Sequence, residues 1–285
     1  MTDTAGRVVL VTGASSGIGL ATAVSAADAG FRVVATVRDL ERVSDLRDAA
    51  RRVGVERGIE IAELDVTDAA SITACVDDVI ARHGRLDALV NNAGIGRVST
   101  LENDTMEAIR ASFEVNFFGV VALTRAALPH LRATSGRVVS VTSVGGIVGQ
   151  PFNETYCAAK FAVEGFMEGL APVAASVGVH VSVIEPGAVA SAFVANAGLD
   201  PERMIAEAGP YAGALTRYLE RTAGAFADAQ SPEAVAEVIV SALMVRSPDF
   251  RIQTSAAARA FVGAKLADLD GSAVQSVTRG WVASG

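Results

Sequence analysis

The run Val8-Val-Leu-Val-Thr-Gly13-Ala-Ser-Ser-Gly17-Ile-Gly19 decides the fold of this chain. Its pattern is typical of a buried strand, a glycine-rich turn and the start of an apolar helix at Leu20. Glycines at these positions let the main chain turn sharply and approach a pyrophosphate without a Cβ in the way. The amides of the first helical turn then point at the anion, and the helix dipole favours its charge. The run therefore predicts a dinucleotide site; the alternative is a glycine-rich turn without a ligand.

Outward from this run, short apolar segments alternate with amphipathic stretches of helical length. Consecutive β-branched residues, as in Val33-Val34 and Val138-Val139, favour strands buried on both faces of a sheet. We predict strands over residues 7–12, 32–36, 60–64, 86–91, 137–142, 179–185 and 249–254. We predict helices over residues 17–29, 40–53, 69–83, 106–131, 154–176 and 232–245. The alternation indicates an α/β fold: a doubly wound parallel sheet of about seven strands, with helices on both faces in a three-layer sandwich.

Two regions interrupt this alternation, at about residues 188–230 and 255–285. No linker rich in proline, glycine or serine divides the chain, so we expect a single domain over residues 1–285. An insertion as long as 188–230 usually forms a lid or a binding segment, and we expect it to contact the substrate. The C-terminal tail either contributes to that site or has no binding role.

The composition disfavours several classes of protein. Hydrophobic residues make up 51% of the chain and charged residues 20%, which excludes a disordered protein. The net charge of -8 disfavours a nucleic-acid partner, because phosphate recognition needs a basic surface. The three histidines and two cysteines show no metal-ligand spacing, so we expect no metal. The apolar runs are shorter than the ~20 residues of a membrane span and no secretory signal is visible, so we expect a cytoplasmic protein without a membrane span.

The tip of the second predicted strand favours one nucleotide over the other. An NAD site carries an acidic residue at this tip, where it binds the adenosine ribose. Here the tip holds Val37 and Arg38. An arginine can bind a 2′-phosphate through two charge-assisted hydrogen bonds, whereas an aspartate would repel it. We therefore predict NADP(H) in preference to NAD(H); the alternative is that Arg38 is a solvated charge paired with Asp39 or Glu41.

Tyr156 and Lys160 lie four residues apart, which places both side chains on one face of a helix. A free tyrosine has a pKa near ~10 and exchanges protons poorly at neutral pH. An ammonium at ~4 Å, in an effective dielectric of ~20, stabilises the phenolate by about 4 kcal/mol, or about three pKa units. Tyr156 would then be able to protonate the alkoxide that forms when hydride reaches a carbonyl carbon.

Two polar residues complete a catalytic hypothesis. Ser143 follows the strand at the carboxyl edge of the sheet, where ligands bind in open α/β folds, and can hydrogen-bond the same substrate oxygen. Asn116 lies in an apolar helical stretch and can hold a water that passes protons to Lys160. Each feature alone has an ordinary explanation. A Tyr/Lys pair is common on exposed helices, a serine often ends a strand, and Asn116 can mark a helix kink.

Together these motifs resemble those of the short-chain dehydrogenase/reductase family, whose single-domain members have a Rossmann-like fold. The motifs fall in the order and spacing of that family over residues 7 to about 190. They are Thr12-Gly13-x-x-x-Gly17-Ile18-Gly19, Asp65-Val66, Asn91-Asn92-Ala93-Gly94, Asn116, Ser143, Tyr156-x-x-x-Lys160 and Pro186-Gly187. The stretch from Ser143 to Gly165 also resembles the hydroxysteroid and retinol dehydrogenase branch of the family.

The resemblance implies a role for each matching residue. Ser15 and Arg38 would share the 2′-phosphate. Asp65 would flank the adenine, although it is also a common turn residue, and Ser191 would stand in for the threonine that binds the carboxamide. The implied catalytic residues are Asn116, Ser143, Tyr156 and Lys160. The implied cofactor-binding residues are Gly13, Ser15, Ser16, Gly17, Ile18, Gly19, Arg38, Asp65, Val66, Asn92, Ala93, Gly94, Tyr156, Lys160, Pro186, Gly187, Val189 and Ser191.

The resemblance further implies an oxidoreductase that transfers hydride between NADP(H) and a hydrophobic ketone or secondary alcohol, such as a steroid, a retinoid or a polyketide-like compound. The alternative is an NADP-binding regulator or scaffold without turnover. The steroid enzymes use a histidine in the insertion, but no histidine follows His180 here, and Arg221 lies near the expected place. Apolar residues of the insertion would close a slot over the substrate, or they are the core faces of two surface helices. The expected substrate contacts are Val144, Gln150, Phe193 and Tyr218.

The family also has a common mode of assembly. Its members often pair two long helices across a two-fold axis, here over residues 106–131 and 154–176. The resemblance therefore implies a homodimer or a homotetramer. The apolar residues Phe161, Phe166 and Leu170 permit such a pairing but fit a core equally well.

Overall fold

A computed structural model of the chain describes residues 4–191 and 200–283. Its centre is a seven-stranded sheet in the order β3-β2-β1-β4-β5-β6-β7, in which every pairing is parallel. The predicted α/β fold is confirmed. The first and last residues of each predicted strand lie within two residues of those observed. The strands are β1 Val8–Val11, β2 Arg32–Val37, β3 Ile59–Glu63, β4 Ala88–Asn91, β5 Arg137–Val141, β6 His180–Glu185 and β7 Arg251–Gln253.

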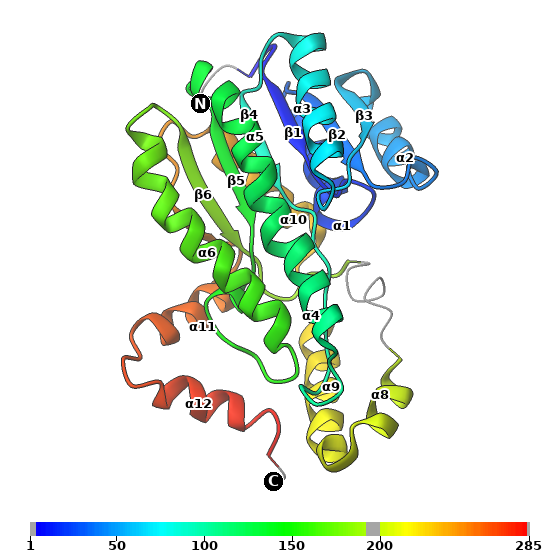
Figure 1. Cartoon of the computed structure of the whole chain (residues 1–285), viewed down its shortest axis with the longest axis vertical. Helices are drawn as coiled ribbons and strands as arrows, with labels where there is room; N and C mark the ends of the chain where they lie inside the picture. The colour runs from blue at the N-terminus through cyan, green and yellow to red at the C-terminus, as the bar shows by residue number, and fades with distance from the viewer. Residues whose placement is uncertain (1–3, 192–199, 284–285) are drawn as a thin grey trace.

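Alternate residues of the central strand face two different helical layers. Val9 and Val11 pack in one hydrophobic cluster with helices α1, α2 and α10, and Val8 and Leu10 pack in another with α3, α5 and α6. The sheet is therefore the middle of three layers (Figure 1). These helices are α1 Gly17–Asp28, α2 Ser44–Val53, α3 Ala69–His83, α5 Gly119–Ala133, α6 Glu154–Ala175 and α10 Pro232–Met244.

The winding of the chain reverses at β1, which lies between β2 and β4. The register pairs Val11 with Ala35 on one side and with Val90 on the other, so that the carboxyl ends of these strands lie level. In open parallel sheets, ligands bind at the carboxyl edge next to such a switch point. The glycine-rich turn follows β1 directly and therefore lies at this edge.

One predicted helix is interrupted. Residues 106–131 form α4 (Met106–Phe113), a π-helical turn η2 (Glu114–Phe118) and α5 in place of one regular helix. The fully buried Asn116 explains the change, because its side chain is held from outside the helix. Its Oδ1 accepts from the Ile95 amide at 3.0 Å, and its Nδ2 donates to the Ile95 carbonyl at 3.0 Å. Wider turns of this kind frequently mark functional sites.

Taken as one helix, Met106–Ala133 has 28 residues and a mean hydropathy of 1.2, and in the described part of the chain it is the one helix that could cross a membrane by length and composition. Charged residues such as Arg110 and Arg125 interrupt this helix, so it contains no continuous apolar run of its full length. Leu123 and Leu131 are fully buried in the core. Since a core helix passes the same test, this is weak evidence for a span.

The insertion and the tail add helices at one end of the molecule (Figure 1). They pack in two small clusters of their own. One joins Val144 and Ile147, next to β5, to the tail residues Val262 and Val274. The other is formed around Phe152 by side chains of the insertion. The added helices are α8 Pro201–Glu207, α9 Ala212–Ala227, α11 Ala256–Leu266 and α12 Ser272–Arg279.

Candidate active site

The turn after β1 has the backbone that suits a phosphate loop. Gly13 and Gly17 have φ angles of +68° and +56°, in the left-handed region that favours glycine. A Cβ on Gly19 would lie 2.3 Å from the Gly13 carbonyl oxygen and 2.4 Å from Asn92 Nδ2, so no side chain fits there. The N-cap residue Ser16 makes no side-chain cap, and the first turn of α1 carries no acidic residue. The amides at this helix start therefore suit an anion.

Thr12 ties this turn to the loop after β4. Its Oγ1 accepts hydrogen bonds from the main-chain amides of Asn92 and Ala93, at 2.9 Å each. The Asn92 Nδ2 donates in return to the Thr12 carbonyl at 2.9 Å and to the Gly13 carbonyl at 3.3 Å. The Asn92 side chain is thus committed to holding the glycine turn in shape. Thr12 is a functional residue that the sequence shows only as the first position of the glycine motif.

Arg38 follows β2 at its carboxyl tip with an exposed side chain, after the buried Val37. Among the ion pairs of residues 4–191 and 200–283, none joins Arg38 to Asp39 or Glu41. Asp39 accepts instead from the Glu41 amide at 2.8 Å. The structure therefore gives no support to the alternative in which Arg38 pairs with its sequence neighbours.

Asp65 follows β3 and takes part in a turn. Its Oδ1 accepts from the Thr67 amide at 2.9 Å and from the Thr67 hydroxyl at 2.7 Å. These hydrogen bonds, and to a smaller extent the charge of Arg38, lower the pKa of Asp65. Asp65 and Arg38 therefore lie close enough to interact. The next residue, Val66, lies against the start of α5, where a Cβ on Gly119 would come within 2.8 Å of the Val66 carbonyl oxygen.

Ser143, Tyr156 and Lys160 come together where β5 meets α6. Ser143 accepts from the Gly145 amide at 3.0 Å as the cap of a short helical turn, and its hydroxyl also hydrogen-bonds Tyr156. The Lys160 Nζ lies 5.8 Å from the centroid of the Tyr156 ring and donates to the Val141 carbonyl at 3.0 Å. Tyr156 keeps part of its surface accessible, whereas Lys160 is only 4% exposed. The predicted pair thus shares one face of α6.

Burial governs the ionisation of both side chains. It raises the pKa of Tyr156 well above its usual value, and the hydrogen bond from Ser143 opposes that shift. It lowers the pKa of Lys160 to about 8, which the charge of Glu164 opposes. The predicted net lowering of the Tyr156 pKa is therefore wrong for this structure. Desolvation of the phenol outweighs the effect of the nearby ammonium.

Gly94 and Asn116 lie against Lys160. A Cβ on Gly94 would come within 2.9 Å of Asn116 Oδ1 and 3.5 Å of Lys160 Nζ, so glycine is required for this close approach. The Asn116 side chain is fully engaged: besides its two bonds to Ile95, its Nδ2 donates to Ser112 Oγ at 3.1 Å. Asn116 therefore lies at an irregular turn of the helix, which is one of the two explanations given for it above. It also lies close to Lys160.

The segment after β6 returns to the glycine turn. The Pro186 carbonyl accepts from the Val144 amide at 2.9 Å, which joins this segment to the residue after Ser143. A Cβ on Gly17 would lie 3.2 Å from Ser191 Cβ, so Ser191 lies beside the phosphate loop. The segment brings four of the expected cofactor-binding residues to this edge: Pro186, Gly187, Val189 and Ser191.

The expected substrate contacts are only partly described. Phe193 lies outside the described residues. Val144 is 8% exposed and packs against the tail, so it adjoins Ser143 but offers little surface. The Gln150 Nε2 would lie 3.3 Å from a Cβ on Gly145, which places it near the Ser143 turn. These contacts therefore remain predictions.

Tyr218, the fourth expected contact, is 3% exposed and belongs to a small core. Its ring packs on Phe152 at 5.6 Å between centroids, and its hydroxyl accepts from Asn153 Nδ2 at 3.5 Å. Leu215 is buried in the same cluster. The described apolar residues of α9 thus form the core face of a surface helix, and this packing ties α9 to the start of α6.

The C-terminal tail packs against α9 through Trp281. The Arg221 Cζ lies 4.3 Å from the centroid of the Trp281 ring, and the Phe261 ring of α11 stacks on it at 5.8 Å. The Arg217 Nε and guanidinium NH2 donate to the Val282 carbonyl at 3.0 Å and 2.6 Å. Arg221, the residue near the place of the expected histidine, is thus engaged by the tail.

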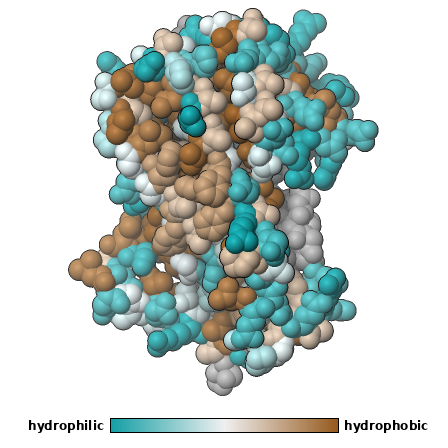
Figure 2. All heavy atoms as spheres, in the orientation of Figure 1, coloured by the Kyte–Doolittle hydropathy of each residue, from teal (hydrophilic) through white to brown (hydrophobic). Residues whose placement is uncertain are grey.

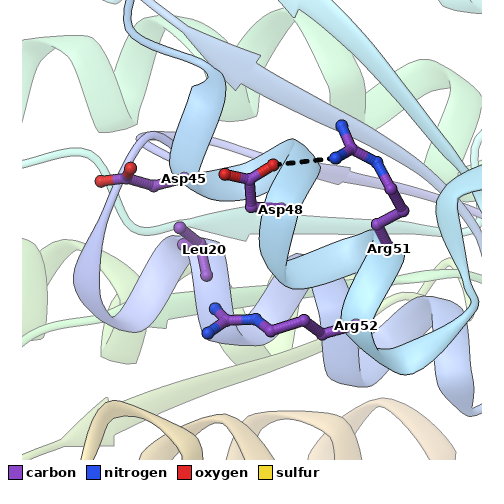
Figure 3. Close-up of a pocket in the computed structure, with 5 residues that line it drawn as sticks. All are labelled: Leu20, Asp45, Asp48, Arg51 and Arg52. Atoms are coloured by element: carbon purple, nitrogen blue, oxygen red, sulfur yellow. Dashed lines mark ion pairs between the residues drawn. The ribbon is translucent and has the colours of Figure 1, made fainter.

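A groove of about 720 Å³ lies elsewhere, between α1 and α2 (Figure 3). Its lining is mostly charged, and Arg51 pairs with Asp48 at 3.1 Å. It contains none of the predicted site residues; it is lined by Leu20, Asp45, Asp48, Arg51 and Arg52. Within residues 4–191 and 200–283, no group of three or more metal-ligating side chains occurs. The polar residues at the carboxyl edge therefore remain the candidate active site.

Comparison with known proteins identifies a family and several similar proteins. The profile of the short chain dehydrogenase family matches residues 7–202. The chain is 40% identical over 272 residues to 17-beta-hydroxysteroid dehydrogenase type 1 from Homo sapiens, covering 93% of this chain and 82% of that protein. It is 38% identical over 280 residues to retinol dehydrogenase 8 from Bos taurus, covering 93% and 87%. The resemblance to the hydroxysteroid and retinol dehydrogenase branch is thereby confirmed.

Solved structures show the same fold. A short-chain dehydrogenase from Streptomyces avermitilis is 33% identical with a TM-score of 0.77, covering 98% of this chain and 99% of that one. A family member from Burkholderia phymatum in complex with NAD is 26% identical with a TM-score of 0.80, covering 95% and 96%. A metagenomic member in complex with NADP is 26% identical with a TM-score of 0.69, covering 88% and 98%. Similar proteins therefore hold either nucleotide.

Proposed function

This chain belongs to the short-chain dehydrogenase family, and from that premise we propose that it is an NADP(H)-dependent oxidoreductase that transfers hydride between nicotinamide and a hydrophobic ketone or secondary alcohol. Family membership already makes it an oxidoreductase of alcohol and ketone groups. The observation that carries the finer proposal is the meeting of Ser143, Tyr156 and Lys160 at the sheet edge that also holds the glycine turn.

In this proposal Tyr156 donates the proton. NADPH, when bound, supplies the hydride, and the substrate oxygen then needs a proton. The Ser143 hydroxyl, which hydrogen-bonds Tyr156, would hold that oxygen within reach of the phenol. The buried Lys160 ammonium would stabilise the tyrosinate that remains after the transfer, because opposite charges attract strongly where water is excluded. Gly94 and Asn116 keep Lys160 in place through close packing.

The residues at the edge fit a dinucleotide. Gly13, Gly17 and Gly19 leave the main chain open where a Cβ would be strained or would collide. Ser191 lies beside this turn and would reach the nicotinamide end, while Asp65 would flank the adenine. The remaining expected residues, from Asn92 to Gly94 and from Pro186 to Val189, border the same edge.

Arg38 supports the choice of NADP(H). It is exposed at the tip of β2 and, although the charge of Asp65 is near, it makes no ion pair among the described residues, so its guanidinium would be available to a 2′-phosphate. Ser15, half-buried in the glycine turn, would share that phosphate. Because one similar structure holds NAD and another NADP, this preference depends on the residues of this chain alone.

The substrate class that we propose is a hydrophobic carbonyl compound. The names of the similar human and bovine proteins specify a hydroxysteroid and a retinol, both large apolar alcohols. The apolar clusters around Val144 and Phe152 lie next to the Ser143 turn and the start of α6, so a substrate held there would have apolar neighbours. A steroid, a retinoid or a polyketide-like ketone is therefore the substrate to test.

We further propose a homodimer or homotetramer in the cytoplasm. Apolar side chains gather on the face over α5 and α6 (Figure 2). Phe118, at the end of η2 before α5, and Phe161 and Val173 of α6 are 50%, 39% and 65% exposed. Exposed apolar patches of this kind commonly mark interfaces between subunits. The molar mass in solution, measured by light scattering, tests the assembly.

NADPH oxidation by the native protein against a panel of steroid, retinoid and polyketide-like ketones tests the function. We expect turnover with apolar ketones and little with small polar ones such as pyruvate. NADPH binding without turnover of any panel member would contradict the proposal and favour a regulator. Dihydroxyacetone and pyruvate serve as polar controls, since each presents a ketone carbonyl without an apolar body.

A further inference from the structure

Two buried carboxylates that the proposed reaction does not use lie behind Lys160. Glu164 of α6 and Glu185 of β6 are 3% and 0% exposed. Arg251 of β7 closes the group: its Nε lies 3.5 Å from Glu164 Oε2 and 3.7 Å from Glu185 Oε1. The Gln253 Nε2 donates to Glu185 Oε2 at 2.9 Å. Carboxylates are rarely buried this deeply unless they are paired with an opposite charge, are hydrogen-bonded or have a functional role.

Compensation is incomplete, because one guanidinium serves three carboxylates. Arg251 also binds the exposed Glu168, whose Oε2 lies 2.5 Å from its NH2. Burial, and then repulsion by Glu185, raises the pKa of Glu164 to about 7, while a Thr142 hydrogen bond and Arg251 oppose the shift. Burial also raises the pKa of Glu185. The pair therefore retains a proton below neutral pH, and Glu164 ionises as the pH rises above about 7.

Glu164 lies one helical turn after Lys160, so the two side chains share a face of α6. Both residues pack against the turn after Ser143. A Cβ on Gly146 would lie 3.1 Å from Glu164 Cγ and 3.3 Å from the Lys160 carbonyl oxygen. The charge of Glu164 opposes the effect of burial on the Lys160 pKa. Glu164 thus acts on Lys160 from the side away from Tyr156.

The other groups that face this pair are known from each neighbouring element. On α6 itself, Tyr156 faces Lys160, and Glu168 pairs with Arg251. The neighbouring elements contribute neutral groups, together with Glu185 and Arg251. The Val141 carbonyl comes from β5 and the Thr142 hydroxyl from the residue that follows it. The Asn116 amide comes from η2, Glu185 from β6 and Arg251 from β7. Within the described residues, Glu164 is the one carboxylate that acts on the charge of Lys160.

We propose that Glu164 is a positioning residue: its carboxylate, held in a buried cluster with Glu185 and Arg251, keeps Lys160 charged where Tyr156 needs a positive neighbour. This proposal rests on the function proposed above. As the pH rises above about 7, Glu164 gains its charge in the same range in which burial would otherwise discharge Lys160. The cluster therefore extends the pH range over which the site retains its ammonium.

The chain has only two lysines, Lys160 and Lys265, which allows a direct test without turnover. Protein labelled with ¹³C at the lysine Cε gives one NMR signal for each, and Lys265 serves as the internal reference. We expect the Lys160 midpoint near 8 in the native protein. Glu164→Gln should lower that midpoint by about one pH unit, since it removes a charge one helical turn away in a buried site. Glu237→Gln, an exposed change on α10 outside the cluster, should leave it unchanged.

Glu185→Gln distinguishes an electrostatic effect of Glu164 on Lys160 from general disruption of the buried cluster. It removes the repulsion on Glu164, which then ionises at lower pH, so the Lys160 midpoint should stay or rise. Glu164→Asp keeps the charge and should restore most of the native midpoint, and it stands in if Glu164→Gln fails to fold. A Lys160 midpoint that is unmoved in folded Glu164→Gln, or that falls equally in Glu185→Gln, overturns the proposal.

Turnover distinguishes this proposal from the function on which it rests. With a reducible ketone, the alkaline fall of kcat/KM should move with the Lys160 midpoint in each variant. A midpoint that moves as expected in a protein that reduces no ketone leaves the electrostatic role intact and contradicts the oxidoreductase. Turnover whose pH profile does not follow the midpoint contradicts the role of Glu164 instead.

Discussion

The nucleotide side and the substrate side of the molecule are built by different means. On the nucleotide side, main-chain atoms approach so closely that single positions exclude a Cβ, as at Gly13 and Gly19. On the substrate side, short helices from the insertion and the tail pack through apolar rings such as Phe152 and Trp281. The first is a matter of backbone geometry and tolerates almost no change. The second is a matter of side-chain packing, which accepts many sequences.

Gly19→Ala should have the largest effect on NADPH affinity, because it distorts the turn on the nucleotide side. Its Cβ would lie 2.3 Å from a backbone oxygen that cannot move without reshaping the turn. We expect NADPH affinity, measured by fluorescence titration, to fall by about 100-fold or more, and the protein to lose ~1–3 kcal/mol of stability. Gly263→Ala in α11 is the matched control, since nothing lies within 4 Å of its Cβ. Native affinity in Gly19→Ala would show that the turn does not cradle the nucleotide.

Arg38→Asp should have the next largest effect, and it sharpens the comparison within the nucleotide side. Loss of charge-assisted hydrogen bonds to a 2′-phosphate, with repulsion in their place, should weaken NADPH by ~10–100-fold and leave NADH nearly unchanged. The ratio of the two dissociation constants cancels any general damage to the fold. Arg52→Asp, an exposed change on α2, provides the control. An unchanged ratio would rule out the nucleotide assignment.

Trp281→Ala should have the smallest effect of the three and should touch the substrate side only. The change removes the stacking of Trp281 on Phe261 and its contact with Arg221, each worth about 1 kcal/mol. We expect KM for an apolar ketone to rise by ~3–10-fold while the dissociation constant of NADPH stays the same. Leu269→Ala, at a fully exposed position of the tail, is the control. A change in NADPH affinity of similar size would mean that the two sides are not independent.

The same difference explains what the sequence could predict. The glycine turn, the positions of the strands and the Tyr156–Lys160 pair follow from local spacing, because φ angles, strand alternation and the helical repeat act over a few residues. The clamp made by Thr12 and the bond from Asn116 to Ile95 join positions far apart in the chain, and no local pattern shows them.

The ionisation of Tyr156 and Lys160 could not be predicted from the local sequence either, because it depends on burial by distant parts of the chain. A charge at i+4 suggests that Lys160 lowers the Tyr156 pKa, yet burial by the whole fold acts more strongly in the opposite direction. The cluster of Glu164, Glu185 and Arg251 likewise joins three separate elements. The expected substrate contacts remain predictions, and local reasoning did not show that Tyr218 belongs to a small core or that Val144 packs against the tail.

Comparing Tyr156→Phe with Tyr211→Phe tests most directly whether the two sides meet at Tyr156. Both changes remove one hydroxyl, but Tyr211 lies outside the site and bonds Glu102. For Tyr156→Phe we expect NADPH to bind as in the native protein and ketone reduction to fall by ~10²–10⁴-fold, the usual contribution of a general acid. Tyr211→Phe should retain both. Equal reduction rates in native protein and Tyr156→Phe would contradict a proton supplied by this phenol.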